Sequence, residues 1–285
     1  MPLRYAMSSD GFPLYYLMKQ AKRECLYFLH GWPHNHTAWS KEADYLHKKG
    51  FAIISQDLRG NGKSGSPERL EQYGFRSYAD DIETIRKAER KNKIVLIGHS
   101  FGGMVALSYY HYYPLHVRAL VLVDTLYENP VKHIPFFART RAIPLMKHLL
   151  RFMLGNMHTS KKHLPYVDFT KLSSHHDIFC WLQGARETQL KSILAILYEM
   201  LGFDEKSVLR DISVPTLVIE GQRDKRTPEA DVRKMFQSVK HAKLVIVPDA
   251  GHDTNIRNPF TLEHFIGAFL DKVVEKQRQG RTGIH

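Results

Sequence analysis

Short apolar runs alternate with amphipathic segments along most of the 285-residue chain. Between Leu3 and Leu17, two short runs flank a Ser-Ser-Asp-Gly turn signal and predict a pair of strands. Further along, near-continuous apolar runs predict buried strands, and helical spacing of apolar residues predicts helices between them. The predicted strands are 25–29, 51–55, 94–97, 117–123, 215–219 and 243–247, and the predicted helices are 38–49, 77–90, 102–113, 228–236 and 260–274. This alternation indicates an α/β fold, with a mostly parallel sheet covered by helices on both faces.

One long segment interrupts the alternation. Residues 127–204 lie between the sixth and seventh predicted strands, where an ordinary connection takes roughly 2–6 residues. Four prolines divide this segment into several short helical stretches. We therefore expect a helical cap at 127–204, inserted into a single core that consists of residues 1–126 and 205–285.

Composition and charge narrow the class of protein. The chain is 43% hydrophobic and 25% charged, as in ordinary globular proteins. Its formal net charge of +12 attracts anionic partners, but no nucleic-acid-binding module is recognisable, so we expect no specific nucleic-acid binding. No apolar run approaches the roughly 18 residues of a membrane span, and no secretory signal is visible. Cys25 and Cys180 lie far apart in the sequence, so we expect a soluble protein of a reducing compartment, the cytoplasm.

The strongest chemical signal is the run Gly98-His99-Ser100-Phe101-Gly102, directly after a predicted strand and directly before a predicted helix. A sharp strand-to-helix turn forces its central residue into strained dihedral angles, and small neighbours allow the chains to pass closely. The serine oxygen then projects above the sheet. We predict that Ser100 is a nucleophile.

A nucleophilic serine needs a base, and the base needs a carboxylate that orients it. His252 follows the strand 243–247, and Asp224 follows the strand 215–219, so both lie at the edge where parallel sheets place their active sites. The chain order Ser100, Asp224, His252 is the order expected for a triad on such a sheet. Asp124, which ends the strand 117–123, and Asp253, beside the histidine, are alternative carboxylates.

A tetrahedral intermediate needs two preorganised amide donors. The Phe101 amide, at the start of a helix, is one candidate. The other candidate is the Trp32 amide, in the loop His30-Gly31-Trp32-Pro33 after the strand 25–29. Pro33 has no amide hydrogen, so it can stiffen the loop but cannot donate.

Two other motifs suggest ligands but fail on their context. Residues 60–65 spell G-x-G-x-x-G after a strand, but the next helix starts only near Ser77, whereas a dinucleotide fingerprint opens a helix at once. His30, His34 and His36 could suggest zinc, but no further ligand follows at a typical spacing. We therefore expect no cofactor and no metal.

Taken together, these motifs resemble those of the α/β-hydrolase superfamily, in its single-cap branch of esterases and lipases. The resemblance covers nearly the whole chain and rests on five segments in order: 30–33, 57–64, 98–103, 221–224 and 250–252. It implies an eight-stranded sheet and a Ser100–His252–Asp224 triad, with Trp32 and Phe101 as oxyanion donors.

Two features separate this chain from parts of that superfamily. Asn61 stands where a histidine or phenylalanine is often seen. The loop 30–33 also looks like that of epoxide hydrolases and haloalkane dehalogenases, which carry an aspartate nucleophile where this chain has Ser100. We therefore expect a serine hydrolase that cleaves small carboxylic esters through an acyl-enzyme. The alternatives are a carbon–carbon bond or thioester hydrolase with the same triad, or a ligand-sensing protein on the same fold.

The first half of the cap is both basic and apolar. From Tyr127 to His163 it holds seven Lys or Arg and one acid. Apolar residues between Pro144 and Leu154 fall at helical spacing, with Lys147, His148 and Arg151 opposite. One interpretation is a stripe that packs on the core, and the other is a basic amphipathic face that meets anionic lipid or an acyl substrate. If apolar residues of 134–154 line the cleft above Ser100, medium-chain esters are favoured over acetyl esters.

Overall fold

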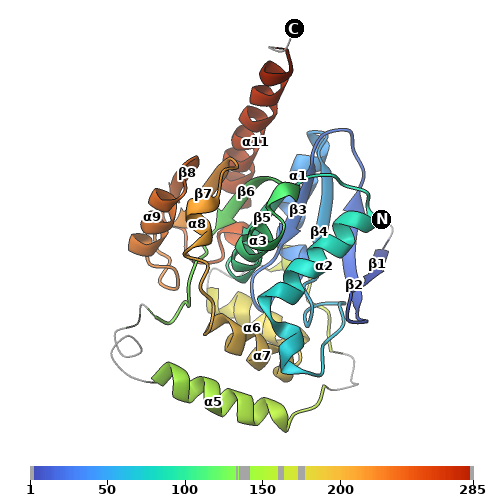
Figure 1. Cartoon of the computed structure of the whole chain (residues 1–285), viewed down its shortest axis with the longest axis vertical. Coiled ribbons are helices and arrows are strands. Elements are labelled where there is room, and N and C mark those ends of the chain that lie inside the picture. Colours follow the sequence, from blue (N-terminus) through green and yellow to red (C-terminus); the bar gives the residue numbers. More distant parts are fainter. Residues whose placement is uncertain (1–2, 133, 135–141, 160–163, 173–176, 283–285) are drawn as a thin grey trace.

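The described part of the chain forms an eight-stranded sheet (Figure 1). The computed structural model describes residues 3–132, 134, 142–159, 164–172 and 177–282, with side chains as far as Val273. The strands are β1 (Leu3–Met7), β2 (Pro13–Lys19), β3 (Cys25–Leu29), β4 (Ala52–Gln56), β5 (Ile94–His99), β6 (Val117–Val123), β7 (Thr216–Gly221) and β8 (Ala242–Val247).

The sheet is mostly parallel, as predicted. Its strands run in the order β1-β2-β4-β3-β5-β6-β7-β8. β2 is antiparallel to both of its neighbours, and all other pairs are parallel. Because the parallel strands point the same way, the residues that follow β3, β5, β6, β7 and β8 gather at one edge.

Helices cover both faces of the sheet, which explains the near-continuous apolar strands. Along β3, Tyr27 points into one core with α2 (Phe75–Ala88), α3 (Phe101–Tyr112) and α9 (Glu229–Ser238). Phe28 points into the opposite core with α1 (Ser40–Lys48) and α11 (Pro259–Thr282). Neighbouring strand residues face opposite sides, so both sides must be apolar. α11 extends past the predicted end at 274, because the polar residues that follow are good helix formers.

The described part of the segment between β6 and β7 is mainly helical, and the two ends of the segment lie next to each other. It contains α5 (Ala142–Gly155), α6 (Asp177–Glu187) and α7 (Leu190–Met200), which lie together at one end of the sheet (Figure 1). Its two ends pair side by side, because Glu128 bridges to Asp204 and the Glu205 amide donates to the Tyr127 carbonyl at 2.8 Å. This segment, 127–204, is called the cap below.

The cap is packed onto the core through α7, not through the outward face of α5. Ala195 and Ile196 of α7 are fully buried in the same core as β3. On α5, Leu150 and Leu154 are buried, but four apolar residues on its other side are exposed: Leu145 (70%), Leu149 (56%), Phe152 (69%) and Met153 (40%). The predicted stripe is therefore split, and most of it faces solvent. Among the residues that the structure describes, no helix has both the length and the apolar character to cross a bilayer.

Candidate active site

A tight crossing of main chains fixes Ser100 above the sheet. Ser100 joins β5 to α3 with φ 50° and ψ −117°, a conformation that L-residues rarely adopt. A Cβ atom at Gly98 would lie 2.4 Å from the Gly102 carbonyl oxygen, and one at Gly102 would lie 2.3 Å from that of Leu29. Both positions therefore require glycine. The Ser100 amide donates to the Val123 carbonyl at 2.9 Å, which ties the turn to β6.

The three predicted triad residues lie in hydrogen-bonding contact. His252 Nε2 is 2.8 Å from Ser100 Oγ, and His252 Nδ1 is 2.6 Å from Asp224 Oδ2. Asp224 follows β7, and His252 lies between β8 and α10 (Thr254–Arg257). With Nδ1–H donating to the carboxylate, Nε2 presents its lone pair to the serine hydroxyl. This arrangement can move a proton away from Ser100.

The electrostatics of this contact favour a charged pair. Burial opposes protonation of His252, but the charge and hydrogen bond of Asp224 outweigh it and raise the pKa of His252 above its ordinary value. Burial also acts to raise the pKa of Asp224. Bonds from His252, Thr227 and the Arg226 amide reverse that effect and lower it. Asp224 is thus the carboxylate that stays ionised beside the histidine.

The two alternative carboxylates have other partners. Asp124 Oδ1 accepts from the Gly221 amide at 2.9 Å, and its Oδ2 accepts from the Thr254 amide at 3.2 Å. Burial, and then the charge of Asp224, raise the pKa of Asp124 far above its usual range. Asp253 is buried too, and burial raises its pKa to about 6. Neither carboxyl group is hydrogen-bonded to the His252 ring among the described contacts.

Sequence reasoning missed two residues that support Asp224. The Thr227 hydroxyl contacts both Asp224 Oδ2 and Glu220 Oε1, the latter at 2.7 Å. One hydroxyl proton cannot serve two carboxylates, so Glu220 must itself be protonated. Burial, followed by the nearby Asp124, raises the pKa of Glu220 to about 11, in agreement with that count. The sequence feature that could have pointed to Glu220 is its position as a single acid within the mostly apolar strand β7.

Of the two predicted oxyanion donors, Phe101 follows Ser100 in the chain, and Trp32 lines the same cavity as Ser100. Phe101 is the first residue of α3, so its amide has no acceptor within that helix. Trp32 follows β3, and the Trp32–Pro33 peptide bond is cis. The Trp32 ring packs edge-on against Trp181 of the cap, with centroids 5.6 Å apart. Their role as donors stays a prediction.

A cavity of about 650 Å³ opens over Ser100 and His252. Its walls come from the core and from the cap, and most of them are apolar. The described lining residues are Trp32, Ser100, Met104, Asp124, Thr125, Leu126, Pro130, Val131, Ile134, Ile178, Trp181, Leu197, Met200, Lys225, Arg226, Thr227, Pro228 and His252.

This lining corrects the source predicted for the apolar wall. Of the described residues in 134–154, only Ile134 lines the cavity, while α5 turns its exposed apolar side to solvent. The cap wall comes instead from α6 and α7, because these helices pack between α5 and the sheet edge (Figure 1). Phe136, Phe137, Arg139 and Arg141 lie outside the described residues.

The three histidines of the 30–36 loop do not converge on one point. His30 Nε2 accepts from the Leu58 amide at 3.0 Å, and its Nδ1 donates to the Gly31 carbonyl at 2.8 Å. His36 Nδ1 lies 2.7 Å from Asp57 Oδ1. Both rings therefore already have hydrogen-bond partners in the core.

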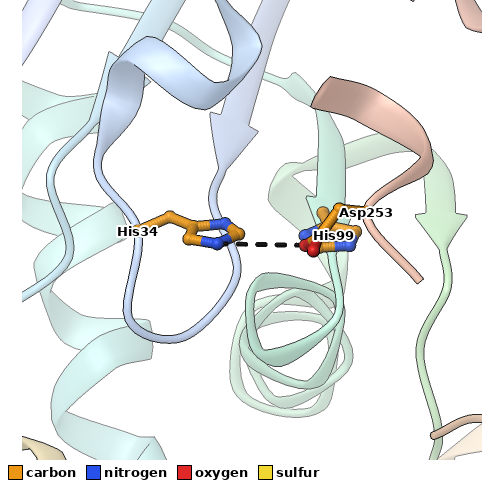
Figure 2. Close-up of side chains that lie close together, drawn as sticks. All are labelled: His34, His99 and Asp253. Carbon is orange, nitrogen blue, oxygen red and sulfur yellow. Dashed lines mark ion pairs between the residues drawn. The ribbon is translucent and has the colours of Figure 1, made fainter. Parts of the chain in front are cut away.

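His34, His99 and Asp253 form a different, buried cluster (Figure 2). The His99 ring lies next to the His252 ring, with centroids 5.2 Å apart. His34 Nε2 is 3.8 Å from Asp253 Oδ1, and His99 Nε2 donates to the His252 carbonyl at 2.8 Å. Burial is the main cause that lowers the pKa of His99 to about 3, so this ring is neutral. The cluster could offer ligands to a metal ion or a water. None of the three is among the described residues that line the cavity, and the contact of the cluster with His252 is the hydrogen bond from His99 to its main chain.

Family models match most of the chain. Residues 24–151 match a model described as alpha/beta hydrolase fold, and residues 203–279 match one described as TAP-like protein. With the eight-stranded sheet, these matches show that the chain belongs to the α/β-hydrolase superfamily.

Individual relatives are distant in sequence. The chain is 28% identical to the AB hydrolase superfamily protein YisY of Bacillus subtilis, over 79% of this chain and 83% of that protein. It is 25% identical to the bifunctional esterase/perhydrolase DCH of Acinetobacter calcoaceticus, over 93% and 99%. A solved thermophilic esterase from Thermogutta terrifontis superposes with a TM-score of 0.73 at 22% identity, over 96% and 99%, which shows the shared fold. The chain spans about half of Protein ABHD8 of Homo sapiens, 54%, at 26% identity over 86% of this chain.

The carboxylate that orients His252 can be identified without any substrate. In the wild type we expect the pKa of His252 to lie above its ordinary value of 6.5. Asp224→Asn should lower it, because the largest effect that opposes burial is then lost. Asp124→Asn should shift it less, because the charge of Asp124 is a smaller cause of the raised pKa than the charge of Asp224. NMR titration of the imidazole resonances measures all three values. A larger fall in Asp124→Asn would assign the orienting role to Asp124.

Proposed function

We propose that this protein is a serine hydrolase of carboxylic esters that works through an acyl-enzyme and favours apolar acyl groups. The single observation that supports it most is the hydrogen-bonded line from Asp224 through His252 to Ser100, which ends in a largely apolar cavity. The proposed reaction uses no metal and no organic cofactor.

The proposed mechanism moves one proton back and forth through His252. His252 Nε2 takes the Ser100 hydroxyl proton as Ser100 Oγ bonds to the ester carbonyl carbon. The Trp32 and Phe101 amides stabilise the negative oxygen that forms. The intermediate then collapses, and His252 gives its proton to the departing alcohol. Water, deprotonated by His252, attacks the acyl-enzyme in the same way and releases the acid.

Other reactions of the same triad remain as alternatives. A thioester, or the carbon–carbon bond of a vinylogous diketone, can be cleaved by an identical set of groups. An ester is preferred because relatives of this chain carry the names esterase and esterase/perhydrolase. A ligand-sensing protein has no need of the complete, hydrogen-bonded line of three residues found here.

The nucleophile can be tested directly. Ser100→Ala should fold normally and lose ester hydrolysis by a factor of about 10³ or more, as removal of a triad member does. A fluorophosphonate probe should label the wild type and leave this variant unlabelled. Hydrolysis of p-nitrophenyl octanoate and gel-based labelling provide the two measurements, and circular dichroism controls for folding. Wild-type turnover by Ser100→Ala would refute the serine mechanism.

The apolar wall should set the preferred chain length. Burying each methylene in an apolar site contributes about 0.8 kcal/mol. Three further methylenes would therefore raise kcat/KM by about 50-fold if the gain reaches the transition state. We expect kcat/KM for p-nitrophenyl esters to rise from acetate to octanoate. Leu197→Ser should flatten this rise, whereas Leu149→Ser, on the outer face of α5, should not. A flat profile in the wild type would exclude an acyl-binding role for the wall.

We also propose that the outward side of α5 contacts anionic lipid. Its exposed apolar residues, Leu145, Leu149 and Phe152, stand beside the exposed Arg151, and the helix Ala142–Gly155 contains no acid. A helix with an apolar side and only basic charges suits the interface of an anionic bilayer. The net charge of +12 acts in the same direction.

Vesicle binding tests this contact. The full chain should co-sediment with vesicles that contain phosphatidylserine, and binding should weaken as salt rises because exposed charges are screened. The double variant Leu149→Ser/Phe152→Ser should lose binding, while Leu115→Ser, which changes a still more exposed leucine outside the cap, should retain it. Equal binding by both variants, or by neutral vesicles at all salt concentrations, would contradict the proposal.

A further inference from the structure

Two cations line the cavity without an acidic partner. Lys225 and Arg226 are exposed side chains that form part of its wall, and neither makes an ion pair or side-chain hydrogen bond among the described residues. Their neighbours in the chain differ. Arg223 pairs with Asp249 at 2.5 Å, and Arg233 pairs with Glu229 at 2.6 Å. On this side of the molecule, the basic residues that face the cavity are thus the unpaired ones.

The triad itself fixes where these cations stand. Asp224 Oδ1 accepts from the Arg226 amide at 2.7 Å and from the Thr227 amide at 3.3 Å. The turn that holds the catalytic carboxylate in place therefore also holds the backbone of the next residues. Arg226 lines the same cavity as Ser100 and His252. An anion bound at its guanidinium would therefore share that cavity with the reacting ester.

The rest of the cavity offers no group that would neutralise the two cations. Asp124 is the only carboxyl group among the described lining residues. Burial raises its pKa far above the usual range, and its two oxygens accept hydrogen bonds from the Gly221 and Thr254 amides. The walls opposite are apolar, with Trp181, Leu197 and Met200 from the cap. The matching ligand is a molecule with an apolar body and a negative group at one end.

We infer that the substrate is an ester that carries a carboxylate, which Arg226 and Lys225 bind at the rim of the cavity. This rests on the proposed ester hydrolase function and deepens it. The planar guanidinium of Arg226 can hold a carboxylate through two parallel hydrogen bonds, and Lys225 adds a point charge. The same two charges draw an anionic substrate towards the opening. The carboxylate belongs either to the acyl chain or to the alcohol part.

Matched ester pairs distinguish these two sources. The acyl-side pair is mono-p-nitrophenyl suberate and the p-nitrophenyl ester of suberic monoamide, which differ only in a terminal carboxylate or amide. The alcohol-side pair is 4-(octanoyloxy)benzoate and 4-(octanoyloxy)benzamide. The measured quantity is the ratio of kcat/KM for the anionic ester over the neutral ester in each pair. We expect a ratio of about tenfold in one pair, which falls as salt is added.

Variants then locate the preference. The double variant Lys225→Met/Arg226→Gln should bring that ratio down to about one, because the amide that holds Asp224 is retained while both charges are lost. Arg223→Gln removes a cation of the same loop that lies outside the cavity, and it should keep the wild-type ratio.

The outcomes separate the two levels of the proposal. Ratios near one in both pairs for the wild type, or a ratio that survives in the double variant, would overturn the carboxylate site while ester hydrolysis stands. If all four esters stay intact in the presence of the wild type, the proposed function fails and the carboxylate site with it.

Discussion

The close crossing of three main-chain segments at Ser100 is the constraint on which the rest of the site depends. β5 must turn into α3 within one residue. A side chain at Gly98 would clash with the main chain of Gly102, and a side chain at Gly102 would clash with the main chain of Leu29. The turn forces Ser100 to a positive φ and so stores strain, which the buried sheet on both sides must hold. The crossing also places the start of α3, with its free amides, beneath the serine oxygen. The predicted nucleophile and one predicted oxyanion donor, the Phe101 amide, therefore come from one backbone feature.

The surroundings of the three acids at the site favour ionisation of Asp224 over that of Asp124 and Glu220. Asp124, Glu220 and Asp224 gather at the ends of β6 and β7, where three ionised groups would repel one another strongly. Burial and the neighbouring acids raise the pKa values of Asp124 and Glu220, while His252 lowers that of Asp224. Asp124 accepts from two amides, and Glu220 contacts the Thr227 hydroxyl, which also contacts Asp224. The acid that favours the ionised form is therefore the one that contacts His252.

The sequence predicted those parts of the structure that follow from local rules. Apolar runs predicted the strands, and the rule that sites lie at the carboxyl edge of parallel strands brought Ser100, Asp224 and His252 together. Glu220 could not be found in this way, because its function depends on the proton of Thr227 and not on any spacing. The orientation of α5 was also beyond the pattern. Helical spacing defines an apolar side, but tertiary packing of α6 and α7 decides which side is covered.

Chemistry and selection are divided between the two parts of the chain, and the loop after β7 belongs to both. The core supplies the triad through turns that are fixed by main-chain hydrogen bonds, so it tolerates little change. The cap supplies apolar wall through Ile178, Trp181 and Leu197, whose side chains can vary without disturbing those turns. Asp224 and Arg226 are two residues apart in one turn, with the carboxylate facing His252 and the cation facing the cavity. Arg226 contacts Asp224 through its main-chain amide and not through its side chain. The side chain of Arg226 is therefore free to bind a substrate, while its backbone helps to hold Asp224.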